Sequence, residues 1–235
     1  MEIRPIAKIY TDFGEKFGVP RQSGRVEEAF GKIVFEPEYR RKEALRGMEG
    51  FSHLWLIFDF SKAHRQTWSP TVRPPRLGGN TRVGVFASRS PFRPNPLGLS
   101  CVKLLSVGDD PEYGGVLFVG GVDLIDGTPI FDIKPYIPYA DCRPNAVGGY
   151  ADAEKDHRLT VSDPEGLIEK LPEEKRSAAL SCIADDPRPA YRDDPDRIYG
   201  MDFAGFDIRF TVSNGEATLR EIEKNAKKDG LSPFS

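Results

Sequence analysis

Glycine and proline limit what this chain can fold into more than any other feature of its sequence. There are 23 glycines and 20 prolines, together 43 of the 235 residues. Proline removes a backbone donor and fixes φ, and glycine weakens the interior of helices and strands. Long helical periodicity is accordingly scarce in the first 140 residues, where short apolar runs bounded by turn residues take its place. We expect strands at 3–10, 25–35, 52–60, 82–87, 98–107 and 116–124.

Many short strands at this spacing predict a mainly β fold that closes, or nearly closes, into a barrel. One helix fits residues 37–46, with Leu45 facing inward and Gly47 as its stop. We therefore assign residues 1–143 to a β-barrel domain.

The composition changes after about residue 143. Residues 145–156 are small and polar, so we expect a linker over 144–163. Residues 164–184 have a helical texture interrupted by Pro172, and strands at 204–212 and 216–222 are joined by an Asn-Gly turn. These elements predict a small α+β domain over 164–224, followed by a disordered tail over 225–235.

The longest acid-free stretch runs from residue 61 to residue 108. The whole chain carries −3, so the residues outside this stretch sum to −11, that is, −3 minus +8. Segregated positive charge attracts anions such as phosphates and carboxylates, although a merely solvated arginine-rich surface is the alternative. The eight basic residues of this stretch are Lys62, Arg65, Arg73, Arg76, Arg82, Arg89, Arg93 and Lys103.

Several classes of protein are excluded by what the sequence lacks. No apolar run approaches the ~20 residues of a transmembrane helix, and the N-terminus lacks the apolar stretch of a signal peptide. Three widely spaced cysteines predict no disulfide framework and a reducing cytoplasm, and three scattered histidines predict no metal site. The sequence has no Walker phosphate loop, no GxGxxG dinucleotide loop after a strand and no GxSxG nucleophile elbow.

The sequence ASRSPFRPNPLGLS, residues 87–100, is the first motif that could carry chemistry. Its prolines stiffen a loop that presents Arg89 and Arg93, whose planar guanidinium groups suit phosphate or carboxylate. Phe92 lies between them and could stack on a base. The alternative is a structural crossover whose arginines pair with the acidic remainder of the chain.

A second motif, VDLIDGTPIFDIKPY, covers residues 122–136. Asp126 begins a tight turn whose amides and carboxylate can hold hydroxyls or an amine. Asp132 and Lys134 alternate with apolar residues and face the same side of a strand, so a simple salt bridge is the alternative to a functional role. Without further information the residues indicate a β-rich protein with a basic, proline-stiffened site for an anionic or nucleic-acid ligand.

The chain resembles a known family in these motifs. GVFASRSPFRPNPLGLS, DGTPIFDIKPYIPYAD, PRQSG, GMEGFSHLWLIFDF, PTVRPPRLGG and DPRPAYR are similar to the TsaA-like family, also called YaeB or TrmO. Its members are tRNA N6-threonylcarbamoyladenosine-37 methyltransferases. The resemblance covers residues 3–212. It implies a non-Rossmann TsaA-like β-barrel, S-adenosyl-L-methionine as cofactor, a homodimer, and the tRNA anticodon loop carrying threonylcarbamoyl-adenosine (t6A) at position 37 as substrate.

The resemblance also implies the cofactor contacts, whereas the roles expected toward the substrate follow from the chemistry of methyl transfer and from the charge of the basic stretch. Many relatives carry histidine at the position of Ser61, so a backbone contact is expected there. Catalytic roles are expected for Asp126 as proton acceptor and for Asn95 and Tyr136 as positioners. Arg93 or Lys134 would hold the threonyl carboxylate of the substrate base, and Arg73, Arg76, Phe92, Arg188 and Arg192 would contact tRNA. Expected cofactor contacts are Pro20, Arg21, Gln22, Phe60, Ser61, Arg89, Leu99, Leu124, Ile125, Asp126, Gly127 and Thr128.

Two other functions use the same residues. A non-catalytic RNA-binding barrel would need only the basic surface. An oligomeric interaction protein would use the arginine loop against a partner subunit.

Overall fold

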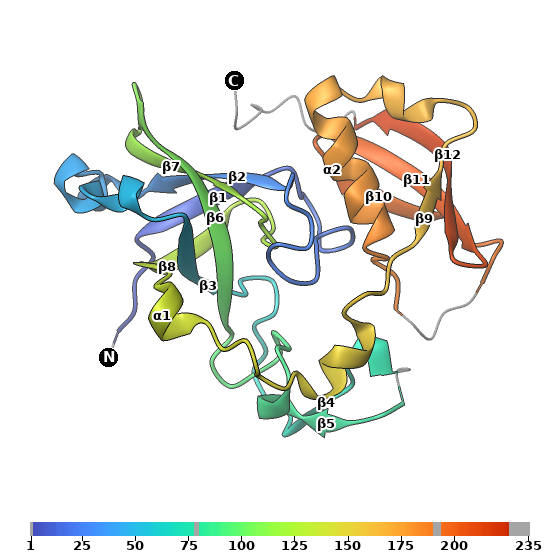
Figure 1. Ribbon diagram of the computed structural model, residues 1–235, viewed down its shortest axis with the longest axis horizontal. Coiled ribbons are helices and arrows are strands. Elements are labelled where there is room, and N and C mark those ends of the chain that lie inside the picture. Colours follow the sequence, from blue (N-terminus) through green and yellow to red (C-terminus); the bar gives the residue numbers. More distant parts are fainter. Residues whose placement is uncertain (1, 78–79, 190–193, 226–235) are drawn as a thin grey trace.

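Six antiparallel strands close into a barrel in the computed structural model (Figure 1), which describes residues 2–77, 80–189 and 194–225. The side chains of Arg76 and Glu154 also lie outside the description. The expected non-Rossmann β-barrel is therefore confirmed. Around the barrel the strands are β1 (Ala7–Thr11), β2 (Phe30–Phe35), β7 (Gly114–Gly120), β6 (Leu97–Asp110), β3 (His53–Asp59) and β8 (Thr128–Pro135).

The alternation of apolar and polar residues along the strands determines which side chains fill the interior of the barrel. In β3 the buried positions are Leu54, Leu56 and Phe58, and the residues between them are partly exposed. This period of two places every second side chain on the inner face of the sheet. The barrel therefore has a packed core, which includes Ile9, Ile33, Leu54, Leu56, Leu117 and Ile130, all without exposed surface.

The prediction of a helix at 37–46 is wrong. That segment forms two short 3₁₀ turns, η1 (Pro37–Tyr39) and η2 (Lys42–Leu45), followed by η3 (Met48–Gly50). Leu45 is buried, as expected, and is the one buried residue of these three turns. A segment that buries a single side chain gains little from tertiary packing, which supplies most of the stability of short helices.

Several expected strands differ in extent, among them β1, which begins at Ala7 rather than at residue 3. Residues 82–87 form only the short β5 (Val83–Gly84), paired with β4 (Thr71–Val72), before the 3₁₀ turn η5 (Val85–Ala87). β2 begins at Phe30 rather than at residue 25, and β7 ends at Gly120 rather than at residue 124. Gly121 follows with φ of 70°, a left-handed conformation that turns the chain out of the sheet.

A second sheet has the order β10-β11-β12-β9 and packs beside α2 (Glu173–Ala184) (Figure 1). Pro172 directly precedes α2, where the lost donor costs nothing. Asn214 and Gly215 both have positive φ, which confirms the expected hairpin turn. The strands are β9 (Thr160–Ser162), β10 (Tyr199–Phe203), β11 (Phe206–Ser213) and β12 (Glu216–Lys224), and β10 was not expected from the sequence.

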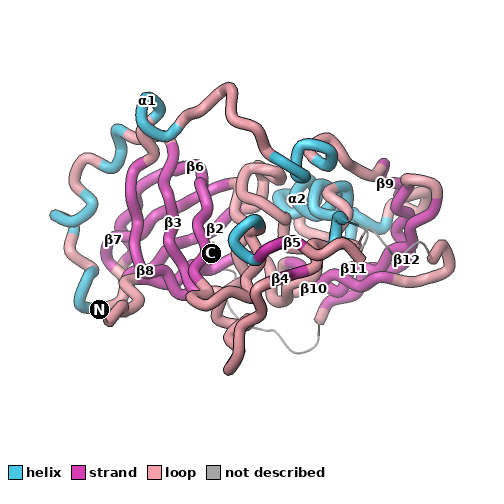
Figure 2. The backbone as a smooth tube through the Cα atoms, turned by 90° about the horizontal axis from the view of Figure 1, so that it is seen from below, coloured by secondary structure: helices cyan, strands magenta, loops and turns pink. Residues whose placement is uncertain are grey.

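The segment expected as a linker is partly structured. After α1 (Pro138–Asp141), the chain forms the 3₁₀ turn η6 (Gly149–Glu154) and crosses to the second sheet (Figure 2). There β9 pairs in parallel with β12. The 3₁₀ turns η4 (Pro75–Leu77) and η7 (Leu167–Lys170) complete the described elements. The tail expected to be disordered lies outside the described residues from 226 onward.

The loop between β1 and β2, residues 12–29, joins the barrel to the second sheet and α2, which together we call the second domain. It is the dark blue loop beside α2 in Figure 1. Phe13 pairs with Phe203 in an isolated β-bridge, and their ring centroids are 5.4 Å apart. Lys175 Nζ lies 2.6 Å from Asp12 Oδ2, and Arg25 forms an ion pair with the buried Asp185. The second domain therefore fixes this loop.

Gly98 is required for packing inside the barrel. A Cβ at this position would lie 2.2 Å from Cζ of Phe58, whose ring is buried against Phe60. We expect Gly98→Ala to lower the free energy of unfolding by about 1–3 kcal/mol, since the ring must move within a packed core. Chemical denaturation measures this loss. Gly84→Ala is the control, because a Cβ there would meet nothing within 4 Å and its φ is −57°; an equal loss in both variants would contradict the packing argument.

Candidate active site

One end of the barrel collects most of the expected cofactor residues. Strand pairing sets Ile9 opposite Thr128, Phe58 opposite Ile130, and Phe30 opposite Gly120. The ends of β1, β3 and β7 and the beginnings of β2, β6 and β8 therefore meet at one end, which we call the site end. The loops 12–29, 60–96 and 121–127 all emerge there. They carry Pro20, Arg21, Gln22, Phe60, Ser61, Arg89, Leu124, Ile125, Asp126 and Gly127, with Thr128 at the beginning of β8.

The beginning of β6 is a strand edge open to these loops. Residues 97–103 of β6 pair with β3, whereas pairing with β7 begins only at Lys103. On the β7 side of this extension the Cys101 N–H donates to Ser23 Oγ at 3.2 Å. Leu99 lies on the same extension and is 56% exposed. A backbone edge and an apolar side chain are thus both available to a ligand.

Arg89 and Gln22 join two expected motifs. The Arg89 guanidinium donates a hydrogen bond to Gln22 Oε1 across 67 residues of sequence. Gln22 Nε2 in turn donates to the carbonyl oxygen of Arg21 at 2.6 Å. The proline-stiffened loop and the 20–22 loop therefore meet at the site end, and Arg89 stays exposed.

Backbone contacts hold the Asp126 turn against the end of β1. The Thr11 N–H donates to Asp126 Oδ1 at 3.0 Å, and the Asp126 N–H donates to the Phe13 carbonyl at 2.8 Å. Gly127 has φ of 74°, which the tight turn requires, and Thr128 Oγ1 donates to the Ile125 carbonyl at 2.6 Å. The turn presents the exposed Asp126 carboxylate at the site end in a fixed orientation.

Asp123 is a site residue that sequence reasoning missed. Its Oδ1 is buried and has no hydrogen-bond partner among the described residues. Burial raises the pKa of Asp123 to about 6, although the Ser100 hydroxyl, the backbone N–H groups of Asp123 and Ser23, and the charge of Arg89 favour the ionised form. The sequence signal was weak, because a lone acid inside an expected strand is usually an outward-facing residue. Gly121 instead turns the chain out of the sheet, and Asp123 lies beside Ser23 of the 12–29 loop and Ser100 of β6.

The raised pKa of Asp123 predicts how the stability of the fold changes with pH. The folded value of about 6 lies above the ordinary 3.8, so the ionised form is less stable in the folded state. Stability from this group is therefore present at low pH and is lost as pH rises through 6, by about 3 kcal/mol in total. Asp123→Asn should remove that loss, so the variant gains on the wild type between pH 4 and pH 7.5. Urea denaturation at both pH values measures the gain. Asp109→Asn, at an exposed position, should show none. If the difference in stability between Asp123→Asn and the wild type is the same at both pH values, the burial argument is contradicted.

Tyr136 and Lys134 lie at the opposite end of the barrel. β8 begins beside Asp126 and spans eight residues, or about 26 Å at ~3.3 Å per residue, before it reaches Tyr136. Within one chain, Tyr136 therefore cannot share a site with Asp126. The Lys134 ammonium lies 2.9 Å from Asp132, so the salt-bridge interpretation of that pair is confirmed.

The residues expected to contact substrate divide into two groups. Arg93 lies at the site end, where its guanidinium donates to the Ser88 carbonyl at 3.1 Å, and Phe92 lies 3.7 Å below the guanidinium of Arg65. Arg73 and Asn95 are exposed. The side chain of Arg76 and the whole of Arg192 lie outside the described residues.

Arg188, which was expected to contact tRNA, is largely buried against Asp186. Its guanidinium donates to both carboxylate oxygens of Asp186 at 2.8 and 3.2 Å, and its side chain is 12% exposed. Its carbonyl, with that of Asp186, accepts hydrogen bonds from Arg21. Arg188 thus belongs to the interface between the two domains, because the buried Asp186 needs a cation.

The basic stretch stays largely free of acidic partners. Arg82 donates to Thr71 Oγ1, Lys62 to the Gly14 carbonyl, and Arg89 and Arg93 to the groups given above. In the described part of the chain, none of these four cations pairs with a carboxylate. Within the described residues, Arg89 and Arg93 therefore do not pair with the acidic remainder, and their positive charge is available to a ligand.

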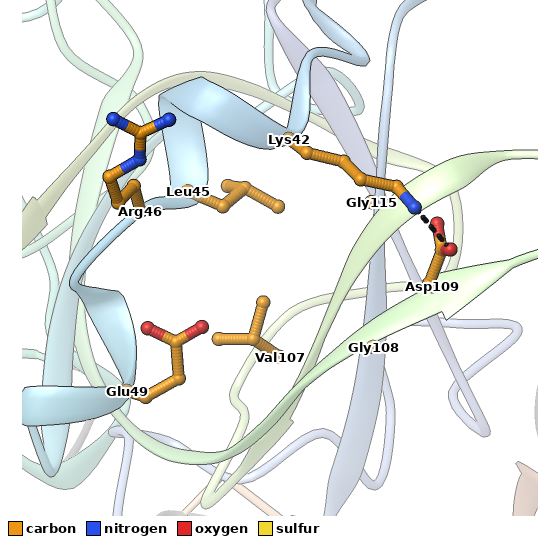
Figure 3. A pocket seen from close by; sticks show the side chains of 8 residues that line it. All are labelled: Lys42, Leu45, Arg46, Glu49, Val107, Gly108, Asp109 and Gly115. Carbon is orange, nitrogen blue, oxygen red and sulfur yellow. Dashed lines mark hydrogen bonds and ion pairs between the residues drawn. The ribbon is translucent and has the colours of Figure 1, made fainter.

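A shallow pocket of about 240 Å³ lies at the other end of the barrel (Figure 3). It is lined by Leu45, Val107 and Gly115, and the ion pair between Lys42 and Asp109 borders it. None of the expected cofactor residues lines it. Among the described residues no cluster of His, Cys, Asp or Glu could hold a metal ion, and no described helix is long and apolar enough to cross a membrane.

Comparisons with known proteins agree with the motifs. Family models match at residues 8–142, for the tRNA-methyltransferase O N-terminal domain, and at residues 168–225, for the TrmO C-terminal domain. A protein of Escherichia coli K12 named tRNA (adenine(37)-N6)-methyltransferase is 42% identical over 94% of this chain and 97% of its own. One of the same name from Eikenella corrodens is 44% identical over 73% of this chain and 97% of its own.

Solved structures agree with the fold. Two crystal structures of TrmO from Pseudomonas aeruginosa have TM-scores of 0.78 and 0.77 at 32% and 31% identity. They cover 96% and 95% of this chain and are themselves covered to 97% and 98%. The chain therefore belongs to the tRNA-methyltransferase O (TrmO) family.

Proposed function

We propose that this chain is an S-adenosyl-L-methionine-dependent tRNA methyltransferase that methylates N6 of t6A at position 37. The observation that carries the proposal is the meeting of the 20–22 loop, the Arg89 loop, the open edge of β6 and the 123–128 segment at one barrel end. Relatives named tRNA (adenine(37)-N6)-methyltransferase, and others named S-adenosylmethionine-dependent methyltransferase, support it.

The donor set at the site end fits the cofactor. The buried Asp123 Oδ1 lacks a donor among the described residues, and Arg89 offers an exposed guanidinium for a carboxylate. Leu99 provides apolar surface on an open strand edge. When bound, S-adenosylmethionine supplies an activated methyl group on a sulfonium. The residues proposed to hold it are Pro20, Arg21, Gln22, Phe60, Ser61, Arg89, Leu99 and 123–128. For Arg21 this means its backbone carbonyl, because its guanidinium and its backbone N–H both contact the second domain.

Two residues of the site end are proposed to act on the substrate base. Asp126 would accept the N6 proton, because its carboxylate is exposed and is oriented by the Thr11 N–H. Asn95, in the exposed loop before β6, would position the base. Arg93 is the cation proposed for the threonyl carboxylate, since Lys134 lies at the other end of the barrel.

The basic stretch is proposed to hold the anticodon stem and loop. Within the described residues Lys62, Arg82, Arg89 and Arg93 form no ion pair with a carboxylate, so phosphate can bind them without breaking one, and binding should weaken steeply with salt. Unpaired bases are usually recognised by stacking. Trp68 is 53% exposed beside Phe86, with ring centroids 6.3 Å apart, and is the aromatic residue proposed to stack.

We also propose a cytoplasmic homodimer, as the family resemblance implies. Cys101, Cys142 and Cys182 are free thiols, which is consistent with a reducing compartment. The exposed side chains of Leu97 and Leu99 at the site end are apolar surface that a second copy would cover. Sedimentation would show a dimer.

The proposed function is tested with purified chain, S-adenosylmethionine and two tRNA samples that differ only in the threonylcarbamoyl group. Nucleoside mass spectrometry should show one added methyl on t6A and none on unmodified adenosine at position 37. Equal methylation of both samples would contradict t6A specificity. Salt-sensitive tRNA binding without any methyl transfer would instead support the non-catalytic RNA-binding alternative.

A further inference from the structure

Asp123 is among the residues proposed to hold the cofactor, and its buried carboxylate oxygen can bind only one part of that ligand. The residue stands on the 121–127 loop, with Ser100 of β6 and Ser23 of the 12–29 loop beside it. These contacts leave Oδ1 buried and without a donor among the described residues. A buried acceptor without a donor costs about 1–3 kcal/mol, so a ligand that brings an N–H group there gains what the free protein lacks.

The charges around Asp123 indicate the kind of ligand. Arg89 is close enough to lower the pKa of Asp123, yet no hydrogen bond or ion pair between them is found in the described residues. The positive charge of Arg89 favours the ionised form of this carboxylate, and its guanidinium, which donates to Gln22 Oε1, is exposed. A carboxylate and a guanidinium set apart in this way match the ammonium and carboxylate of an α-amino acid.

We propose that Asp123 accepts a hydrogen bond from the α-ammonium group of the methionine part of the methyl donor, while Arg89 binds its carboxylate. This inference rests on the proposed function, because it names the part of that cofactor which the Asp123 corner of the site end receives. It makes Asp123 a cofactor-binding residue that selects ligands with an intact amino acid. No proton transfer is required of it.

The test compares four adenosine ligands on the wild type and on Asp123→Asn by isothermal titration calorimetry at pH 8. The ligands are S-adenosylmethionine, S-adenosylhomocysteine, its deaminated analogue 5′-deoxy-5′-(3-carboxypropylthio)adenosine, and 5′-methylthioadenosine. The wild type should bind S-adenosylhomocysteine at least about tenfold more tightly than the deaminated analogue, as a charge-assisted hydrogen bond predicts. In Asp123→Asn this preference should disappear, while affinity for the deaminated analogue and for methylthioadenosine stays the same.

The other outcomes contradict either the assignment of Asp123 or the proposed function. Equal weakening of all four ligands in Asp123→Asn would mean that Asp123 faces the adenosine or only supports the loops. Weakening of S-adenosylmethionine alone would place the carboxylate against the sulfonium. If the wild type binds none of the four ligands, the proposed function fails rather than this assignment. Asp109→Asn, beside the pocket at the other end of the barrel, is the control and should leave all four affinities unchanged.

Discussion

Lys175→Met is expected to lower the free energy of unfolding by about 3–5 kcal/mol at neutral pH. Lys175 and Asp12 form an ion pair of 2.6 Å with side chains 11% and 8% exposed, so the variant leaves a buried carboxylate without this cation. Burial already raises the pKa of Asp12, and the hydrogen bond and charge of Lys175 oppose that rise. Without Lys175 the pKa should rise further, so the loss of stability should shrink as Asp12 becomes protonated at acid pH.

Lys42→Met is the matched control. Lys42 and Asp109 also form a close ion pair, but their side chains are 71% and 59% exposed (Figure 3). Exposed pairs contribute about 0–1 kcal/mol because water screens them. Urea denaturation of the two variants should therefore differ by several kcal/mol, and equal losses would contradict the claim that the interface between the domains is a buried one.

Arg89→Ala is expected to weaken binding of S-adenosylmethionine by about 10- to 150-fold, which corresponds to the 1.5–3 kcal/mol of a charge-assisted hydrogen bond. The guanidinium is exposed at the site end and is held by Gln22. Arg89→Lys should recover only part of the affinity, because an ammonium lacks the planar pair of donors. Calorimetry measures all three dissociation constants.

Arg82→Ala controls for the general field of the basic stretch. Arg82 is equally exposed, but its guanidinium donates to Thr71 Oγ1 beside β4. Its loss should leave cofactor affinity within about twofold of the wild type. If both alanine variants weaken binding alike, Arg89 acts through net charge and not through a contact with the cofactor.

The sequence predicted well those elements whose structure depends only on residues close together in the chain. The alternation in His53–Asp59 and the Asn214-Gly215 turn each depend on neighbouring residues, and both elements formed as expected. The helix at 37–46 failed because helical texture alone does not supply a packing surface for it. β10 was missed because the sequence does not show that its few apolar residues pack against the loop at Phe13, which is distant in sequence.

The candidate site depends still more on long-range pairing. Motif resemblance identified the segments that meet at the site end, but it could not place them along the barrel. Tyr136 follows Asp126 by only ten residues, yet β8 separates them. Asp123 is the opposite case. The sequence did not single it out, but the turn at Gly121 places it at the site end.

The second domain has a structural role that the sequence did not indicate. Arg21 was expected at the cofactor, yet its guanidinium binds the carbonyl groups of Asp186 and Arg188. The loop that carries Gln22 is therefore fixed from behind by the second domain. Changes at the domain interface should reach the cofactor through this loop, as the Lys175 variant can show if its calorimetric affinity falls together with its stability.

The central claim is that the methyl donor binds at the site end, and hydrogen–deuterium exchange with and without S-adenosylhomocysteine tests it most directly. We predict that the ligand slows amide exchange at residues 21–24, 97–101 and 121–128. Slowed exchange confined to residues 42–49 and 107–115, which surround the pocket at the other end of the barrel, would contradict the claim.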